Sequence, residues 1–284
     1  MDDRSNAEMV SLWNSPTTSA WATNPERYDA MGAPLGQLAL DAARLQPGER
    51  VLDVGCGAGQ LSLQAAALVG PNGSVVGVDV ATRLVELARA RASQTPAAPV
   101  TFVEADAQEH RFDGPFDAVL SQFGVMFFAD PVEAFANLLA ATAPGGRLTF
   151  VCWQPAPVNE WILTALLAMA AHVDPPEVPP PGAPGPFAFG ETDHTRSVLQ
   201  AAGWADVDVA GVETTVRVGG ADTVDGAVTY YVEDTFGRLF LESASPEQRA
   251  AAVASLRDAL EPHVTRNGVT LGAAVWVVTA SRPR

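Results

Sequence analysis

Short apolar runs alternate with amphipathic stretches through the first half of the chain. Five runs are short enough for strands and are bounded by turn residues: 50–54, 74–80, 100–104, 116–121 and 146–153. The stretches between them that have helical spacing are 60–69, 83–93 and 131–142. Strands that are apolar on both faces and alternate with helices are typical of a parallel sheet covered on both sides. The pattern therefore predicts a doubly wound α/β fold whose ligand lies beyond the carboxyl ends of the strands.

The pattern is different at the two ends of the chain. Residues 1–48 are predicted to be helical, with a stop signal at Gln46-Pro47-Gly48. After residue 153 we expect strands at 207–218 and 269–280 among helices at 159–172, 193–202, 223–241 and 246–260. Seven prolines within 174–186 predict a stiff, extended loop. We expect one domain with a helical cap over 1–48, a core over 49–153, and helical insertions with the last strands over 154–284.

The charge balance excludes several classes of partner. The 284 residues include 33 acidic and 17 basic side chains, a formal net charge of −16, and every basic residue is Arg. A surface this acidic repels phosphate backbones and anionic lipids, so we expect no nucleic-acid partner and no membrane docking. Without Lys, neither a lysine Schiff base nor a P-loop lysine is available.

Cysteine usage and the first residues predict a cytoplasmic protein. Cys56 and Cys152 form no C-x-x-C pair, which disfavours a disulfide framework or a thiolate zinc cluster, and we expect no metal. Residues 1–6 are polar and show no secretion signal. The most apolar helical stretch, 161–171, is far shorter than the roughly 20 residues that a bilayer requires, so we expect no membrane insertion.

A glycine-rich turn joins the first strand to the first helix of the alternating region, Asp53-Val54-Gly55-Cys56-Gly57-Ala58-Gly59-Gln60. Glycines there let the backbone approach a ligand closely, and the amides at the helix start suit an anionic group. The dinucleotide fingerprint G-x-G-x-x-G fails, because its sixth position is Gln60. The carboxylate of Asp53 would repel a pyrophosphate and attract an ammonium or sulfonium. The turn therefore predicts a cationic ligand.

Two further carboxylates follow the next strands. Asp79 ends the second strand, where a carboxylate can accept two hydrogen bonds from a ribose diol. Asp106 and Ala107 follow the third strand and can cover an adenine edge. Each feature has a structural alternative when taken singly: Asp79 alone would more often be a helix N-cap, and the cysteines small space-fillers. The occurrence of the glycine turn, Asp79 and Asp106 in this order supports a nucleotide-binding site.

Together with later motifs, these residues resemble a class I S-adenosylmethionine-dependent methyltransferase. The motifs occur in the order Asp53-x-Gly55-x-Gly57-x-Gly59, Asp79, Asp106, Phe116-Asp117-Ala118-Val119 and Pro144-Gly145-Gly146-Arg147-Leu148. The match covers residues 48–153 and is most similar to the small-molecule branch that includes the ubiquinone and menaquinone methyltransferases. The family implies a Rossmann-like, mostly parallel sheet of seven strands whose last strand, here 269–280, runs antiparallel.

The resemblance also implies a cofactor, S-adenosyl-L-methionine, whose product is S-adenosyl-L-homocysteine. The backbone of Gly55 and Gly57 would pack on its methionine portion, and Asp53 would hold its ammonium directly or through water. Asp79 would bind its ribose hydroxyls. The implied contacts are Asp53, Gly55, Gly57, Ser121 and Gln122 for the methionine portion, Asp79 for the ribose, Val80, Asp106 and Ala107 for the adenine, and Cys56 and Gln60 in the turn.

Methyl transfer from a sulfonium requires alignment of the acceptor with the methyl group and exclusion of water. A general base is needed only when the acceptor must lose a proton. The candidate bases are His110, His172, His194 and His263. For each of them, a solvent-exposed position without a catalytic role is the favoured interpretation. His194, which follows the segment 186–190, is the candidate expected near the site, but the catalytic residue is not assigned.

Aromatic residues gather outside the nucleotide half. They lie in the N-terminal segment, which in this family resembles a lid, and after the fourth and fifth strands, where they suit an apolar acceptor pocket. The expected pocket residues are Trp13, Trp21, Tyr28, Phe123, Trp153, Phe187 and Phe189. Phe127, Phe128 and Trp161 fit the core equally well.

These features favour methyl transfer from S-adenosylmethionine to a small, apolar or aromatic acceptor by in-line displacement. One alternative is an NAD-linked oxidoreductase on a similar sheet, against which the failed glycine fingerprint and Asp53 both argue. A second is a protein that binds the cofactor and transfers nothing. The acceptor atom (oxygen, nitrogen or carbon) and the choice between a monomer and a homodimer stay open.

Overall fold

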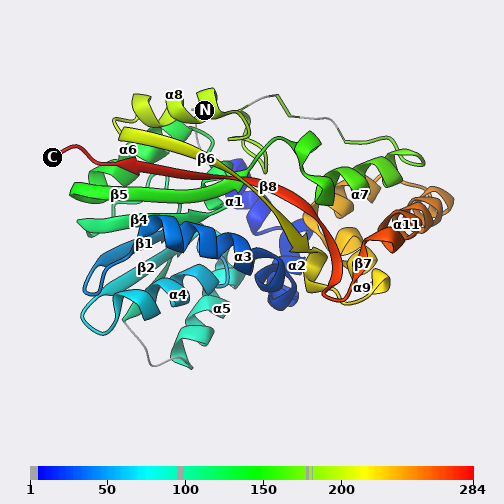
Figure 1. The fold of residues 1–284 in the computed structure, drawn as a ribbon, viewed down its shortest axis with the longest axis horizontal. Helices are drawn as coiled ribbons and strands as arrows, with labels where there is room; N and C mark the ends of the chain where they lie inside the picture. The colour runs from blue at the N-terminus through cyan, green and yellow to red at the C-terminus, as the bar shows by residue number, and fades with distance from the viewer. Residues whose placement is uncertain (1–5, 95–98, 177–178, 181) are drawn as a thin grey trace.

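A central sheet is covered on both faces by helices in the computed structural model, which describes residues 6–94, 99–176, 179–180 and 182–284 (Figure 1). Residues 1–5 of the polar start and residues 177–178 and 181 of the proline-rich stretch therefore lie outside the described residues. The strands are β1 (Arg50–Val54), β2 (Ser74–Asp79), β3 (Val100–Glu104), β4 (Phe116–Gln122), β5 (Thr142–Trp153), β6 (Ala205–Arg217), β7 (Val264–Thr265) and β8 (Gly268–Ser281). The α-helices are α1 (Ala7–Trp13), α2 (Ser19–Thr23), α3 (Pro25–Ala43), α4 (Gln60–Val69), α5 (Thr82–Ser93), α6 (Pro131–Ala141), α7 (Glu160–Ala170), α8 (Thr192–Ala201), α9 (Val224–Glu233), α10 (Thr235–Leu241) and α11 (Pro246–Leu260).

The strand order confirms the sheet predicted from the alternating pattern. The order is β3-β2-β1-β4-β5-β8-β6, and β1 to β5 pair in parallel. The last strand, β8, lies antiparallel between β5 and β6, as the family resemblance implies. The two-residue β7 pairs with β8 off this path. The carboxyl ends of β1, β2 and β4 therefore meet at one edge, where the predicted site residues follow them.

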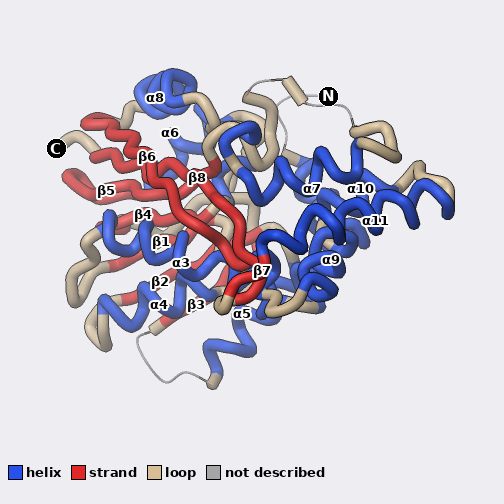
Figure 2. The backbone as a smooth tube through the Cα atoms, turned by 45° about the vertical axis from the view of Figure 1, so that its right-hand side comes forward, coloured by secondary structure: helices blue, strands red, loops and turns tan. Residues whose placement is uncertain are grey.

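Both faces of the central strands β1 and β4 are buried, which is why these strands are apolar runs. On β1, Val51 and Leu52 point to opposite faces and both are fully buried. Helices α3, α4 and α5 cover one face and α6 and α8 the other (Figures 1 and 2). Val51 packs in the cluster of Leu61 and Ala65 of α4, whereas Leu52 belongs to the larger cluster that includes Phe135 of α6.

The late helices form a second group beyond the carboxyl ends of the strands. Figure 2 shows α7, α9, α10 and α11 together on one side of the sheet, and β8 extends far enough to pack against α7. The larger apolar cluster runs without a break from the sheet into this group, since it includes both Phe150 of β5 and Leu256 of α11. No helix among the described residues is long and apolar enough to cross a membrane.

The structure divides the helix predicted over 223–241 into α9 and α10. The backbone of Asp234 is extended (ψ 160°), and its side chain accepts a hydrogen bond from Phe236 N at the start of α10. A Cβ at Gly237 would overlap the carbonyl oxygen of Tyr231, so the two helices need glycine where they approach each other. The apolar spacing over 223–241 is that of a helix along its whole length. The break arises because Asp234 caps the start of α10, and a cap does not change the periodicity of the apolar residues.

Candidate functional site

The glycine turn between β1 and α4 has the conformation that its glycines allow. Gly55 and Gly57 have φ of +69° and +52°, in the left-handed region. A Cβ at Gly55 would lie 2.5 Å from the Cα of Gly124, so the turn packs directly on the segment after β4. At Gly57 a Cβ would meet nothing within 4 Å. Gly57 therefore borders open space in which a ligand can approach the backbone.

Asp53, at the end of β1 just before this turn, has a buried carboxylate oxygen without a partner in the part of the chain that the structure describes. The residue is 1% exposed, and its Oδ2 accepts a hydrogen bond of 2.5 Å from Ser62 Oγ. Its Oδ1 is buried and has no hydrogen-bond partner among the described residues. Burial raises the pKa of the Asp53 carboxyl to about 7, and the nearby charge of Asp79 adds to this rise. A cationic donor at Oδ1 would satisfy the oxygen and stabilise its charge, which fits the ammonium predicted there.

Asp79 holds the turn as well as facing the predicted ribose position. Its Oδ2 accepts from Gly57 N at 2.8 Å and its Oδ1 from Ala81 N at 2.8 Å. Burial raises the pKa of Asp79, while the amides of Ala81 and Gly57 counteract the rise. Each carboxylate oxygen can accept a second hydrogen bond, so the two that a diol would donate remain possible.

The N-terminal segment is attached to the residues predicted to hold the adenine. Asn6 Nδ2 donates to Asp106 Oδ1 (3.1 Å), which also accepts from Gln108 N (3.0 Å). Asn14 Nδ2 donates to Val80 O (2.8 Å), and Asn14 Oδ1 accepts from Thr82 N (3.1 Å). The segment predicted as a cap therefore covers the carboxyl ends of β2 and β3. Sequence reasoning missed Asn6 and Asn14, since no motif marks a contact between distant segments.

Several side chains of the predicted cofactor set are bonded within the protein. Gln60 Nε2 donates to Asp29 O (3.4 Å) and Gln122 Nε2 to Gly32 O (2.7 Å), so both support α3. Ser121 Oγ donates to Val54 O (2.7 Å) and joins the ends of β4 and β1. Ala107 is buried, and its carbonyl oxygen accepts from Asn137 Nδ2.

The Cys56 side chain belongs to an apolar cluster with Val85, Ala88 and Phe102. Burial raises the pKa of its thiol well above the ordinary value, which suits an inert space-filler. Only the backbone of Cys56 remains for the contact that the family resemblance implied.

The expected pocket aromatics fall into two stacked groups. Trp21 stacks on Tyr28 with ring centroids 3.8 Å apart, and Trp13 meets Trp21 (5.6 Å) and Phe127 (5.1 Å) edge-on. On the sheet side, Phe123 stacks on Trp153 at 4.4 Å. Phe123 has φ of +63°, a conformation that non-glycine residues adopt at a cost and that recurs at functional sites. Phe123 and Trp153 lie where β4 and β5 end.

The structure places Phe189 in the core, which corrects its assignment to the pocket. It is 2% exposed and packs against Phe135 and Phe150 on the α6 side of the sheet. Phe187, two residues earlier, is partly buried against the same cluster. Sequence position after a strand does not decide which face a side chain takes, and here the loop returns along the sheet.

None of the described contacts brings a histidine to the carboxylates of the glycine turn. His194 stacks on Phe189 at 5.9 Å, and its buried Nε2 has no partner among the described residues. His263 Nδ1 lies 4.0 Å from Glu160, and the His110 ring packs on Phe112. His194 as a base stays a prediction. Within the described ranges, no three His, Cys, Asp or Glu side chains gather in a way that could hold a metal ion.

A partly buried carboxylate that sequence reasoning missed, Asp234, lies beside the predicted aromatics. Tyr28 OH donates to Asp234 Oδ1 at 3.0 Å, and Arg27 pairs with Glu233 at 2.7 Å. These contacts join α3 to the break between α9 and α10. Residues 206 positions apart meet here, so only a tertiary contact could reveal them.

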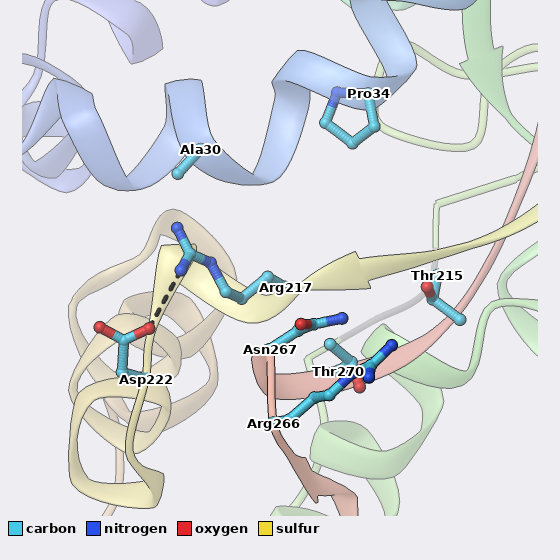
Figure 3. Close-up of a pocket in the computed structure, with 8 residues that line it drawn as sticks. All are labelled: Ala30, Pro34, Thr215, Arg217, Asp222, Arg266, Asn267 and Thr270. Atoms are coloured by element: carbon cyan, nitrogen blue, oxygen red, sulfur yellow. Dashed lines mark hydrogen bonds and ion pairs between the residues drawn. The ribbon is translucent and has the colours of Figure 1, made fainter.

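A separate hollow of about 490 Å³ lies on the other side of α3, between that helix and the ends of β6 and β8 (Figure 3). Arg217, paired with Asp222 at 3.0 Å, and Arg266 reach toward it. No predicted site residue lines this hollow, whose lining residues are Ala30, Pro34, Thr215, Arg217, Asp222, Arg266, Asn267 and Thr270.

Known proteins that resemble this chain include several methyltransferases. Residues 51–146 match the family model described as a methyltransferase domain. The chain is 30% identical to nocamycin O-methyltransferase of Saccharothrix syringae over 266 residues, which cover 89% of this chain and 93% of that protein. It is 39% identical to demethylmenaquinone methyltransferase of Thermus thermophilus over 120 residues, 42% of this chain and 54% of that protein. Its fold is similar to that of phosphoethanolamine N-methyltransferase 2 of Haemonchus contortus, with a TM-score of 0.59, 17% identity, and coverage of 99% of this chain and 60% of that chain.

Proposed function

The chain belongs to the class I S-adenosylmethionine-dependent methyltransferases, and we propose that it methylates a small, apolar or aromatic acceptor by in-line displacement. Family membership overturns the alternative of an NAD-linked oxidoreductase, because the relative that matches along 93% of its length is a methyltransferase. It also makes the chain an enzyme rather than a protein that only binds the cofactor. The acceptor class and the residue roles below are our proposals.

The glycine turn supports the cofactor position that we propose. When bound, S-adenosylmethionine supplies an electrophilic methyl group on a sulfonium. Asp53 Oδ1, the buried oxygen without a protein partner, would accept from its ammonium, and the open space at Gly57 would admit its methionine portion. Asp79 would hold the ribose diol with its remaining lone pairs, and Asp106 Oδ2 is the oxygen proposed for the adenine amino group.

The aromatic groups carry the proposal for the acceptor. Trp13, Trp21 and Tyr28 form one group in the N-terminal segment, and Trp13 reaches Phe127 in the segment that follows β4 and Phe123. Phe123 and Trp153 form the second group. Flat apolar walls on two sides bind a planar apolar molecule and exclude water from the reacting atoms. Attachment of the N-terminal segment through Asn6 and Asn14 supports its proposed role as a lid.

We propose that segments 1–48, 49–153 and 154–284 act as one unit, supported by the apolar cluster that includes Leu35, Phe150 and Leu256. We also propose a cytoplasmic location and no partner beyond the small-molecule acceptor, in a monomer or homodimer. Both cysteines are free and buried, which suits a reducing compartment.

Transfer of an isotopically labelled methyl group tests the proposal. Labelled S-adenosylmethionine would be supplied with hydroxy- and aminonaphthalenes on one side and with phosphoethanolamine and glycine on the other. We expect label in the aromatic products alone. Transfer only to the small charged acceptors would overturn the proposed acceptor class, and absence of cofactor binding by calorimetry would overturn the site.

A further inference from the structure

Tyr28 and Asp234 form a partly buried polar pair inside the proposed acceptor region. Tyr28 OH donates to Asp234 Oδ1 at 3.0 Å, while Asp234 Oδ2 accepts from Phe236 N at 3.3 Å. The Tyr28 ring is stacked on Trp21 and lies 5.7 Å from the ring of Tyr230. The pair is therefore enclosed by aromatic rings, and its carboxylate is held in place by the start of α10.

Two polar atoms beside this pair are buried without a hydrogen-bond partner among the described residues. They are Nε1 of Trp21, whose ring stacks on Tyr28, and Oγ1 of Thr235, the residue after Asp234. Buried polar groups in folded proteins are nearly always hydrogen-bonded, and each exception requires an explanation. The Trp21 N–H, on the ring that stacks on Tyr28, is thus available to a polar group of a ligand, and Thr235 Oγ1 is a second group, one residue from Asp234, that is unpaired within the described ranges.

The pair is also next to the cofactor turn. Asp29, the residue after Tyr28 on α3, accepts from Gln60 Nε2 through its carbonyl oxygen and pairs with Arg91 at 2.7 Å. Arg91 Nη1 in turn donates to Ala58 O within the glycine turn. These contacts fix the helix that carries Tyr28 to the turn that we propose binds the cofactor.

We propose that the acceptor is a planar compound with a phenolic or enolic hydroxyl and that Tyr28 receives the proton of this hydroxyl as the oxygen is methylated. This inference rests on the proposed function. As the acceptor oxygen bonds to the methyl carbon, the carbon–sulfur bond breaks and its electron pair stays on sulfur. The acceptor proton moves to Tyr28 Oη, and the Tyr28 proton moves to Asp234 Oδ1. The positive charge of the sulfonium thereby ends as a proton on a carboxyl group.

The electrostatic surroundings favour this direction of proton transfer. Burial raises the pKa of Asp234, so the protonated carboxyl is well tolerated there. Burial also raises the pKa of Tyr28, which therefore passes a proton on without becoming ionised. The charged and titratable groups around the pair are Arg27, Tyr230, Glu233 and Arg238, whereas the hydroxyl of the neighbouring Tyr231 is bonded to Trp161 O.

Binding of two matched probes tests the proposal without knowledge of the natural acceptor. 2-Naphthol and 2-methoxynaphthalene have the same rings, but only the first can donate to Tyr28 Oη. With S-adenosylhomocysteine present, we expect calorimetry to show at least about tenfold tighter binding of 2-naphthol. Tyr28→Phe should abolish this preference. Equal binding of the two probes, or binding of neither, would overturn the inference.

A second variant separates proton transfer from binding. Asn at position 234 still accepts from Tyr28 OH and still caps α10, but it cannot take the proton. Asp234→Asn should therefore keep the preference for 2-naphthol and slow its methylation by about 100-fold or more. Full methylation activity in Asp234→Asn would contradict the relay.

Tyr231→Phe is the matched control for loss of a buried tyrosine hydroxyl. That hydroxyl donates to Trp161 O, so the control should lower thermal stability and leave the probe preference intact. Binding of S-adenosylmethionine, measured on every variant, distinguishes the two levels of failure. If the wild type does not bind it, the proposed function fails; if it binds and the probes are not discriminated, only this inference fails.

Discussion

Asp79 Oδ2 accepts a hydrogen bond of 2.8 Å from the backbone amide of Gly57, so the carboxylate at the end of β2 holds the glycine turn at the end of β1. The two strands are parallel neighbours, which brings their carboxyl ends to the same edge. A carboxylate predicted to bind a ribose thus also shapes the surface on which the methionine portion would lie. Because Asp79 has both roles, we expect a substitution of Asp79 to alter the conformation of the turn at Gly57, and a substitution of Gly57 to alter the position of the Asp79 carboxylate.

Removal of the Asp79 carboxylate should weaken cofactor binding strongly. Asp79→Ala loses the carboxylate oxygens that accept from the amides of Gly57 and Ala81, together with the proposed ribose contact, and charge-assisted hydrogen bonds contribute about 1.5–3 kcal/mol each. We expect S-adenosylmethionine to bind at least about tenfold more weakly in calorimetry. Asp117→Ala is the control, since Asp117 Oδ2 accepts from Arg50 N at the opposite edge of the sheet. That control should lose stability and keep cofactor affinity, and unchanged affinity in Asp79→Ala would exclude the ribose role.

Cofactor binding should release protons near neutral pH. The folded-state pKa of Asp53 is about 7, against an ordinary value of 3.8, so between these pH values the folded protein binds more protons than the unfolded chain. The free energy of unfolding attributable to Asp53 therefore falls as pH rises from 3.8 to about 7. A bound ammonium favours the carboxylate and expels its proton, about half a proton per cofactor at pH 7.

Calorimetry in buffers with different ionisation enthalpies measures this proton release. Asp53→Asn should bind S-adenosylmethionine more weakly and without proton release. Equal proton release by the wild type and this variant would show that another group titrates.

Gly57→Ala should impair binding more than folding. Its φ of +52° costs an alanine about 1–2 kcal/mol, and the new methyl group would enter the open space proposed for the cofactor. Gly48→Ala is the matched control for backbone strain, because Gly48 has φ of +90° and a Cβ there would also meet nothing within 4 Å. We expect similar losses of Tm in the two variants and weaker cofactor binding in Gly57→Ala alone. A parallel loss of affinity in Gly48→Ala would point to a general effect of strain.

The bridge made by Asn14 should slow release of the cofactor. Asn14→Ala removes one donor to Val80 O and one acceptor for Thr82 N, so the N-terminal segment should open more easily. Stopped-flow measurement of S-adenosylhomocysteine dissociation should show a rate several-fold higher than in the wild type, about fivefold for a loss of 1 kcal/mol. Asn24→Ala is the control, as the Asn24 amide donates to its neighbour Thr23 within the same segment. Identical dissociation rates in all three proteins would mean that the segment does not cover the cofactor.

The fold was predictable, and residues could be proposed for the cofactor site, because the signals for both are local. Apolar runs and glycine turns depend on a few consecutive residues, and a parallel sheet places the residue after each strand at one edge. Asp53, Asp79 and Asp106 were found in this way. The break at Asp234 was not predicted, because a helix cap inside a helical stretch leaves the spacing of the apolar residues unchanged.

The sequence by itself determined the sheet, the antiparallel last strand and the family of the chain. Only the tertiary structure decided which polar groups meet across it: Asn6 with Asp106, Asn14 with Val80, and Tyr28 with Asp234. It likewise decided that Phe189 fills the core while Trp21 stacks on Tyr28. The physical reason is that packing joins segments up to 206 positions apart, and their pairing depends on the path of the whole chain rather than on any local pattern.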